Sequence, residues 1–188
     1  NLQKEETPWP KEARPTSTTL GIDTEWGKDG TLLTIAFADG DSAIAYETGD
    51  PECTEQVTSL LAQAKVVVGH SVVSDIEALS KNFTLKSKWI AGKKIYDSLS
   101  LSRMTNENRL SYELENIVCS LLRVTPWKYN TAELLASSGD MTLISPSLRK
   151  ERCRLDAWAA RKISAELHPL LPPRLVEFTQ ETAHVLSR

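Results

Sequence analysis

The chain has 188 residues, of which 40% are hydrophobic and 25% are charged, and its formal net charge is −3. This size and composition suit one globular domain with a sizeable core. No apolar run reaches the roughly 18 residues that a membrane span requires, and no leader of secretory type opens the sequence. We therefore expect an intracellular protein with no membrane contact. The acidic balance argues against a protein that coats duplex DNA through a broad basic surface.

The three cysteines, Cys53, Cys119 and Cys153, are odd in number and lack close metal-type spacing, so they are typical of reduced thiols in an intracellular protein.

The net charge does not exclude binding of nucleic acid, because an enzyme that holds one strand end needs only a local basic rim. Most basic side chains are solvated surface charges. The candidates for such a rim are Lys81, Lys86, Lys88, Lys93, Lys94, Arg103, Arg109 and Lys128.

Residues 1–17 are polar, contain three prolines and show no sustained periodicity, which predicts a linker or leader. After them, apolar segments with short turns between them predict strands at Thr19–Thr24, Leu32–Ala38 and Ser42–Glu47. Three adjacent strands with short turns form an antiparallel meander.

Helical spacing of leucines and valine follows at Thr54–Ala64, then an apolar strand at Lys65–Gly69 and a helix that begins near Ser71, a plausible N-cap. A helix between two strands implies a parallel addition to the sheet. The remaining elements that we expect are a short strand at Lys94–Tyr96 and helices near Ser98–Met104, Tyr112–Leu122 and Ser147–Glu166. The pattern predicts an α/β fold with a mixed five-stranded sheet flanked by helices.

Four carboxylates in three places carry the chemistry. Asp23 and Glu25 in GIDTEW are two residues apart on a predicted strand, so both side chains lie on one face. Asp75 in VVVGHSVVSDIEAL and Asp156 in ERCRLDAWAA each stand beside an apolar segment, at the edge of a packed core. Four crowded oxygen donors repel one another unless cations separate them, and such sites suit Mg²⁺ or Mn²⁺. Two such ions about 3.5–4 Å apart commonly cleave phosphodiesters.

These motifs, in this order, resemble the DEDD superfamily of 3′–5′ exonucleases over residues from about 19 to 167. The resemblance implies a ribonuclease H-like fold and hydrolysis by two Mg²⁺ or Mn²⁺ ions, with a nucleoside 5′-monophosphate as product. It also implies that Asp23 bridges both ions and that Glu25 binds the ion that activates water. Asp75 would hold the second ion, often through water, and Asp156 would complete the first site.

The segments around the acids supply candidate substrate-binding residues, namely Thr24, Trp26, His70 and Ser71. Trp26, together with Leu32, is placed to line a cleft for the terminal base. His70 could face the substrate, but a structural role at the end of a strand is the stronger expectation. Ser71 stands where the superfamily often carries Asn, with a helix cap as its alternative role. Asp97, by contrast, is expected to cap the next helix and to be structural.

The third motif departs from the family. One DEDD branch carries Tyr four residues before the last Asp and the other carries His five residues before it, whereas this chain has Arg152 and Glu151 there. An arginine cannot act as a base because its pKa is above about 12, although it could orient water or grip the phosphate. Arg152 can also pair with Asp156 at i,i+4. Glu151 could take a proton in place of the His, although an exposed helix charge is its simpler role. We expect slow or altered activity.

Different motifs of the sequence resemble two different branches of the superfamily. GIDTEW and DAWA are similar to the exonuclease domain of Werner-type helicases, whereas IYDSLSLSRM and the tail LVEFTQETAHVLSR are similar to the proofreading domain of family A DNA polymerases. The tail favours the second, so we expect an exonuclease domain at 18–168 and a C-terminal helix at 169–188 that leads into an attached polymerase domain. Its substrate would be single-stranded or mismatched DNA 3′ ends. The alternatives are a catalytically poor 3′-end binding or scaffold module and a stand-alone RNA exonuclease.

Overall fold

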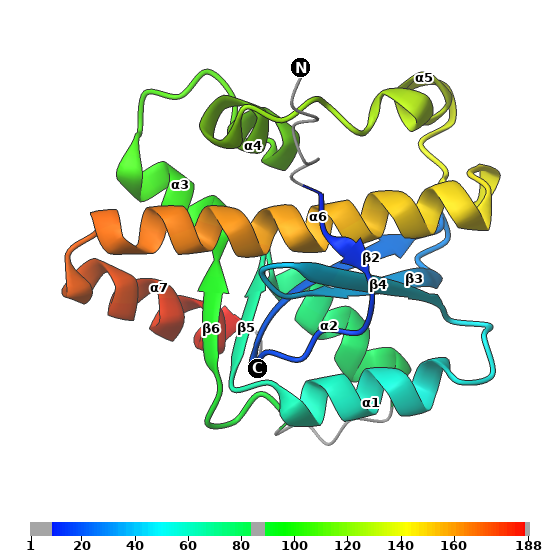
Figure 1. Ribbon diagram of the computed structural model, residues 1–188, viewed down its shortest axis with the longest axis horizontal. Helices are drawn as coiled ribbons and strands as arrows, with labels where there is room; N and C mark the ends of the chain where they lie inside the picture. The colour runs from blue at the N-terminus through cyan, green and yellow to red at the C-terminus, as the bar shows by residue number, and fades with distance from the viewer. Residues whose placement is uncertain (1–8, 84–88, 187–188) are drawn as a thin grey trace, which may run out of the picture.

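The computed structural model describes residues 9–83 and 89–186, with side chains described as far as residue 181. A mixed sheet lies between two groups of helices (Figure 1). Its strands are β1 (Lys11–Glu12), β2 (Thr19–Trp26), β3 (Leu32–Ala38), β4 (Ser42–Glu47), β5 (Val66–Gly69) and β6 (Lys94–Asp97). The helices are α1 (Cys53–Gln63), α2 (Val73–Asn82), α3 (Ser98–Thr105), α4 (Leu114–Leu122), α5 (Tyr129–Ser138), α6 (Pro146–Leu167) and α7 (Pro173–Leu186), with 3₁₀ turns η1 (Met141–Leu143) and η2 (His168–Leu170).

The strand order in the described part of the chain is β1-β4-β3-β2-β5-β6. The predicted meander is confirmed, because β2 pairs antiparallel with β3, and β3 with β4. The parallel addition is confirmed too, since β5 pairs parallel with both β2 and β6. The expected count of five strands is wrong. Strand β1, inside the segment predicted as a linker, pairs parallel with β4 and makes six strands. Its two polar residues are too few for an alternating pattern to show.

The two faces of the sheet bury different helices. Helices α1 and α2 pack with Leu20 and Ile22 of β2 in one hydrophobic core. The long helix α6 crosses β2, β3 and β4 on the other face, with α3 and α4 beside it (Figure 1). Because strand residues alternate, Gly21, Asp23 and Glu25 lie on the face that α6 covers. The alternating pattern of β2 therefore places its apolar side chains in the core under α1 and α2 and its acids on the face that α6 covers.

The contact between β2 and α6 is close because its residues are small. A Cβ atom at Gly21 would lie 2.2 Å from the carbonyl oxygen of Ala157 and 2.8 Å from the Cβ of Arg161. Ala36 of β3 and Ala160 of α6 are also fully buried in this core. Asp156 immediately precedes Ala157, so the depth at which α6 sits on the sheet fixes the position of Asp156 relative to the acids of β2.

Two expectations for helix caps have different outcomes. Asp97 caps α3, as predicted, because its carboxylate accepts hydrogen bonds from the backbone N–H of Leu99 and the hydroxyl of Ser100. Ser71 does not cap α2, whose N-cap residue is Val72 with no side-chain hydrogen bond. Ser71 instead has a φ of 65° and donates its N–H to Asp97 at 2.7 Å. Glycine and asparagine adopt this backbone conformation most readily.

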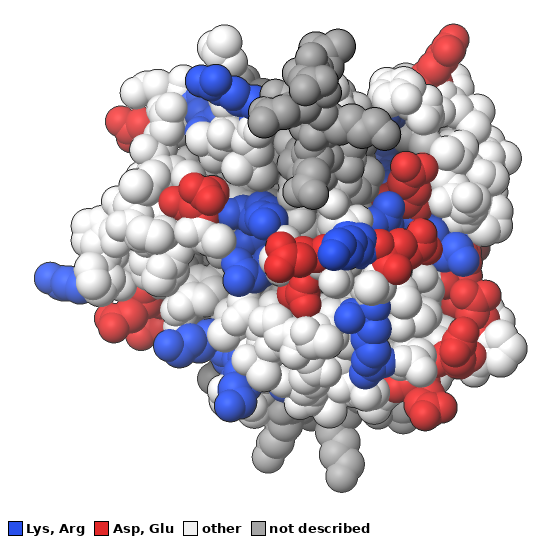
Figure 2. Space-filling model, in the orientation of Figure 1, with Lys and Arg blue, Asp and Glu red and all other residues white. Residues whose placement is uncertain are grey.

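The bounds of the remaining helices agree with expectation to different degrees. Helix α6 extends the predicted range by one residue at each end, whereas α5 was not predicted. No helix within the described ranges combines the length and the apolar character needed to cross a membrane. On the face that Figure 2 shows, basic and acidic side chains are interleaved over α6 rather than gathered in a broad basic field.

The close packing at Gly21 can be tested by adding one methyl group. We expect Gly21→Ala to lower the free energy of unfolding by about 3 kcal/mol, because the new Cβ overlaps the backbone of α6 and overpacked cores lose about this much. Urea unfolding measures the change. The matched control is Gly40→Ala, where an added Cβ meets nothing within 4 Å. Equal stability of the two variants would contradict this account of the β2–α6 contact.

Candidate functional site

Three of the four predicted carboxylates converge. Asp23 and Glu25 project from β2 and Asp156 from α6, and one carboxylate oxygen from each lies within 4.8 Å of the other two. Glu25 and Asp156 are buried, with 8% and 4% of their surfaces exposed. The thiol of Cys153 donates a hydrogen bond to the backbone oxygen of Asp23 at 3.3 Å, which ties α6 to β2 one turn before Asp156.

The fourth carboxylate, Asp75, lies on the other side of β2 and is not part of this group. The hydroxyl of Thr24 donates to Asp75 at 2.5 Å, and the indole N–H of Trp26 donates to the same hydroxyl at 3.1 Å. Thr24 thus fixes the position of Asp75, which is 5% exposed. The metal-binding role of Asp75 and the substrate contacts of Thr24 and Trp26 stay predictions.

The crowding of these acids changes their titration. Burial and the charges of Asp156, Glu25 and Asp75 raise the pKa of Asp23 well above its usual range. Burial also raises the pKa of Glu25, against the opposing effect of Arg152. Burial raises the pKa of Asp75 to about 7, although its hydrogen bonds from Thr24 act in the opposite direction. Negative charge is therefore unfavourable here unless a cation is near.

Two basic side chains lie in direct contact with the acids. Lys128 Nζ is 2.7 Å from Asp156 Oδ2, and Arg152 Nε is 2.8 Å from Glu25 Oε1. Arg152 therefore pairs with Glu25 and not with Asp156, the partner that i,i+4 spacing makes available. Helix α6 directs Arg152 towards the strand, where Glu25 is a buried acceptor, and the second guanidinium contact is to Thr131 of α5 at 2.9 Å. Tertiary contacts replace the local pair.

Sequence reasoning placed Lys128 only on a general basic rim and missed how the chain positions it. The backbone N–H groups of Trp127 and Lys128 both donate to Glu115 of α4 at 2.6 Å. The indole N–H of Trp127 donates to Asp156 Oδ1 at 2.9 Å. The hydroxyl of Thr131 donates to the backbone oxygen of Lys128. Local spacing does not indicate the contacts with Glu115 and Asp156, because those residues lie on α4 and α6.

Asp23 and Asp156 open on a cleft of about 920 Å³ between α3, α4, α5 and α6. Basic, aromatic and apolar side chains share its walls. Arg103 stacks over the ring of Tyr112, with 5.6 Å between the guanidinium carbon and the ring centroid. The lining residues are Asp23, His70, Leu99, Arg103, Tyr112, Glu113, Leu114, Glu115, Lys128, Ala132, Leu135, Ala136, Arg152 and Asp156.

His70 lines this cleft, but both of its ring nitrogens are engaged by the protein. Nδ1 is 2.9 Å from the hydroxyl of Ser98, and Nε2 is 2.9 Å from the backbone oxygen of Tyr112. Burial lowers the pKa of His70. A neutral ring that donates from Nε2 to the carbonyl and accepts at Nδ1 satisfies both contacts, so the geometry supports the structural role over the substrate contact.

The other candidate residues lie away from the acids. Glu151 does not line the cleft; it lines two smaller hollows, one of them with Pro146 and Arg154. Leu32 is 2% exposed in the core under α1 and α2. Ser71 is exposed at the start of α2. Two of the candidate rim residues, Lys86 and Lys88, lie outside the described residues.

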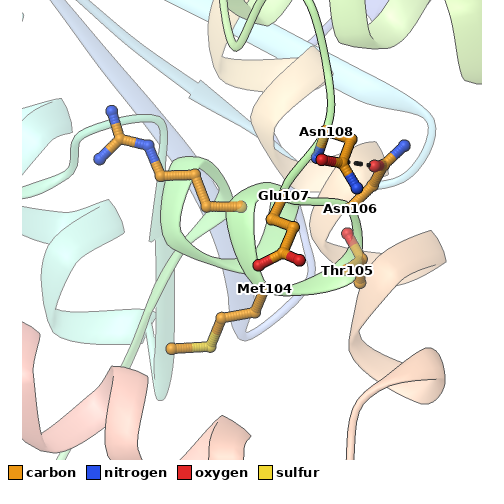
Figure 3. A pocket seen from close by; sticks show the side chains of 6 residues that line it. Met104, Thr105, Asn106, Glu107 and Asn108 are labelled. Atoms are coloured by element: carbon orange, nitrogen blue, oxygen red, sulfur yellow. Dashed lines mark hydrogen bonds between the residues drawn. The ribbon is translucent and has the colours of Figure 1, made fainter.

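A separate hollow lies just beyond the end of α3 and is lined by residues 103–108 (Figure 3). In it, the side-chain oxygen of Asn106 accepts the backbone N–H of Asn108 at 3.1 Å. Glu107 is its one lining carboxylate. Since this hollow brings no acids together, the cleft over Asp23 and Asp156 is the better candidate.

Comparison of the sequence with protein families and with curated proteins gives no match. Solved structures do match the fold. NrnC from Brucella melitensis with bound Mg²⁺ aligns with a TM-score of 0.68 and 17% identity, over 96% of this chain and 89% of that chain. The apo form of a nuclease aligns with a TM-score of 0.64 and 18% identity, over 90% of this chain and 81% of that chain. The POL domain of Pol1 from M. smegmatis, in complex with DNA primer-template and dNTP, aligns with a TM-score of 0.50 and 14% identity. The alignment covers 86% of this chain and 25% of that chain. These likenesses show the fold, and they agree with the expected ribonuclease H-like architecture.

The raised pKa of Asp75 predicts a pH-dependent stability. Between its usual pKa of 3.8 and about 7 the folded chain holds a proton that the unfolded chain has lost. Each pH unit in this window therefore removes about 1.4 kcal/mol of stability. Asp75→Asn keeps an acceptor for Thr24 and has no such proton. With chelator present, the free energy of unfolding of Asp75→Asn should gain on the parent as pH rises from 4 to 7. A constant difference would contradict the shift.

Proposed function

We propose that this chain is a 3′–5′ exonuclease that hydrolyses the terminal phosphodiester of a single-stranded nucleic acid with divalent metal ions. One observation carries the proposal: Asp23, Glu25 and Asp156, from a strand and a facing helix, converge within 4.8 Å beside an open cleft. The motif order that resembles the DEDD superfamily and the likeness to a nuclease structure and to NrnC with bound Mg²⁺ support it.

The donor set fits a hard divalent cation. All three side chains offer carboxylate oxygens, which Mg²⁺ and Mn²⁺ prefer, and the mutual repulsion that raises the pKa of Asp23 would be relieved by a cation. We propose that Asp23, Glu25 and Asp156 hold the metal, with Asp75 as a further carboxylate behind Thr24. When bound, divalent metal would lower the pKa of a water nucleophile and stabilise the negative charge that develops on the phosphate oxygens.

The protein's own side chains would bind and orient the strand end. Arg103 lies in the cleft on the ring of Tyr112, where its guanidinium can meet a phosphate while the ring and Leu99 offer apolar surface to a base. Lys128 lies deeper, against Asp156. Arg152, at the position where one DEDD branch carries Tyr, is engaged by Glu25, which favours slow or altered activity.

At a finer level we propose the 3′ end of DNA as substrate, with the chain acting as the proofreading domain of a family A DNA polymerase. The similarity of IYDSLSLSRM and of the C-terminal tail to that family supports this assignment, as does the likeness to the Pol1 structure with DNA. A catalytically poor 3′-end binding module is the second candidate. Lys128 and Arg152 favour it, since both already neutralise acids of the site.

A polarity assay tests the reaction and the substrate. Single-stranded DNA and its RNA counterpart, each labelled at one end, are incubated with Mg²⁺, Mn²⁺ or chelator. We expect loss of 3′-terminal nucleotides from DNA with either metal and none with chelator. A mismatched duplex terminus should be cut faster than a matched one, because melting a paired end costs unstacking energy. Faster cleavage of RNA would overturn the DNA assignment, and binding of both strands without cleavage would favour the second candidate.

Single substitutions test the metal ligands. We expect Asp23→Ala and Asp156→Ala each to reduce cleavage at least about a hundredfold with folding intact, because losing one ligand removes several kcal/mol of transition-state stabilisation. Asp97→Ala is the control: it should cost about 0.5–2 kcal/mol of stability through the lost helix cap and leave the cleavage rate of the folded protein nearly unchanged. Cleavage by Asp23→Ala at the parent rate, in a preparation free of other nucleases, would show that the metal assignment is wrong.

A further inference from the structure

We propose that Lys128 and Arg152 take the electrostatic place of one divalent ion, so that the acidic cluster binds a single divalent ion instead of two. This inference rests on the proposed function, since it concerns how many metal ions that site holds. It follows from three features: which carboxylate oxygens are already engaged, how much charge remains, and how the two basic side chains are held.

Two basic side chains and one indole already engage three of the carboxylate oxygens of the cluster. Asp156 is engaged through both oxygens, Oδ1 by the indole N–H of Trp127 at 2.9 Å and Oδ2 by Lys128 at 2.7 Å. Glu25 is engaged through Oε1 by Arg152 at 2.8 Å. The hydrogen bonds among the described residues leave Glu25 Oε2 and the carboxylate oxygens of Asp23 open, while each oxygen of Asp156 keeps only one further lone pair for a metal ion. That set suits one ion on the β2 side of the cluster.

The balance of charge agrees with one ion. Asp23, Glu25 and Asp156, the three acids that converge, contribute three negative charges when ionised. Lys128 and Arg152 supply two positive charges inside the same cluster, which leaves one negative charge, so one divalent ion more than neutralises it and a second ion would add only excess positive charge. A second ion at Asp156 would also lie next to the ammonium group of Lys128, and like charges at such separations repel strongly where water is scarce.

The two basic groups are fixed parts of the structure. Glu115 holds the backbone at Lys128 through two hydrogen bonds of 2.6 Å. Thr131, which is 3% exposed, joins the two cations, because its hydroxyl accepts from Arg152 and donates to the backbone oxygen of Lys128. The side chain of Lys128 is 24% exposed and that of Arg152 is 18% exposed. Their charges are therefore preorganised over the acids.

The number of bound ions tests the inference without any measurement of activity. Titration calorimetry and Mn²⁺ electron paramagnetic resonance should count one Mn²⁺ per parent chain. Lys128→Met removes the ammonium group and should bind two Mn²⁺ ions, with the first at least about tenfold tighter. Lys128→Arg keeps the charge and should bind one. Lys94→Met is the matched control, because Lys94 is exposed on β6 and outside the cleft, and it too should bind one.

Each outcome decides between the inference and the proposed function. Two Mn²⁺ ions in the parent chain would overturn the inference and leave the proposed function standing. One ion in both the parent and Lys128→Met would also overturn it. No Mn²⁺ in the parent chain would overturn the inference, and no Mn²⁺ in any variant would overturn the metal assignment of the proposed function as well. Circular dichroism checks folding; if Lys128→Met does not fold, Arg152→Gln replaces it and should gain a second ion.

Discussion

The constraint on which the structure depends is the close approach of several buried negative charges. Asp23, Glu25 and Asp156 repel one another, and burial makes that repulsion stronger, as the raised pKa of Asp23 shows. The packing of α6 on β2 opposes it. Because Gly21 has no side chain and faces the backbone of Ala157, the helix lies deep enough on the sheet for its apolar contacts to hold the acids together. The same contact thus serves both the core and the site.

The compensation for this charge comes from a part of the chain with little core of its own. Helix α5 buries only Thr131 among its residues, yet its first turn and the preceding loop bring Lys128 and Trp127 onto Asp156. Glu115 of α4 holds that loop. A carboxylate outside the acidic cluster therefore controls where the positive charge of the cluster lies, and the site extends through α4 as well as through the sheet.

The sequence predicted well where a repeating pattern determines structure. Strands β3 and β4 match their expected bounds, and the alternation on β2 correctly placed Asp23 and Glu25 on one face. It predicted poorly where single long-range contacts decide. The i,i+4 spacing offered Arg152 a different partner from the one it has, since a buried acid across the core is the stronger attraction. Helix α5 and the two-residue strand β1 were missed because one lacks a strong apolar stripe and the other is too short to have a pattern.

Strand β1 also bears on how the protein behaves at high concentration. It covers the start of the outer edge of β4, where Lys11 donates to the backbone oxygen of Asp41 at 2.8 Å and Ala13 to that of Ala43 at 3.2 Å. An uncovered strand edge offers its N–H and C=O groups to a second chain. Loss of this short strand would leave the acids in place and open a template for intermolecular pairing. The damage would then show as aggregation of otherwise folded protein, with the chemistry of each remaining molecule intact.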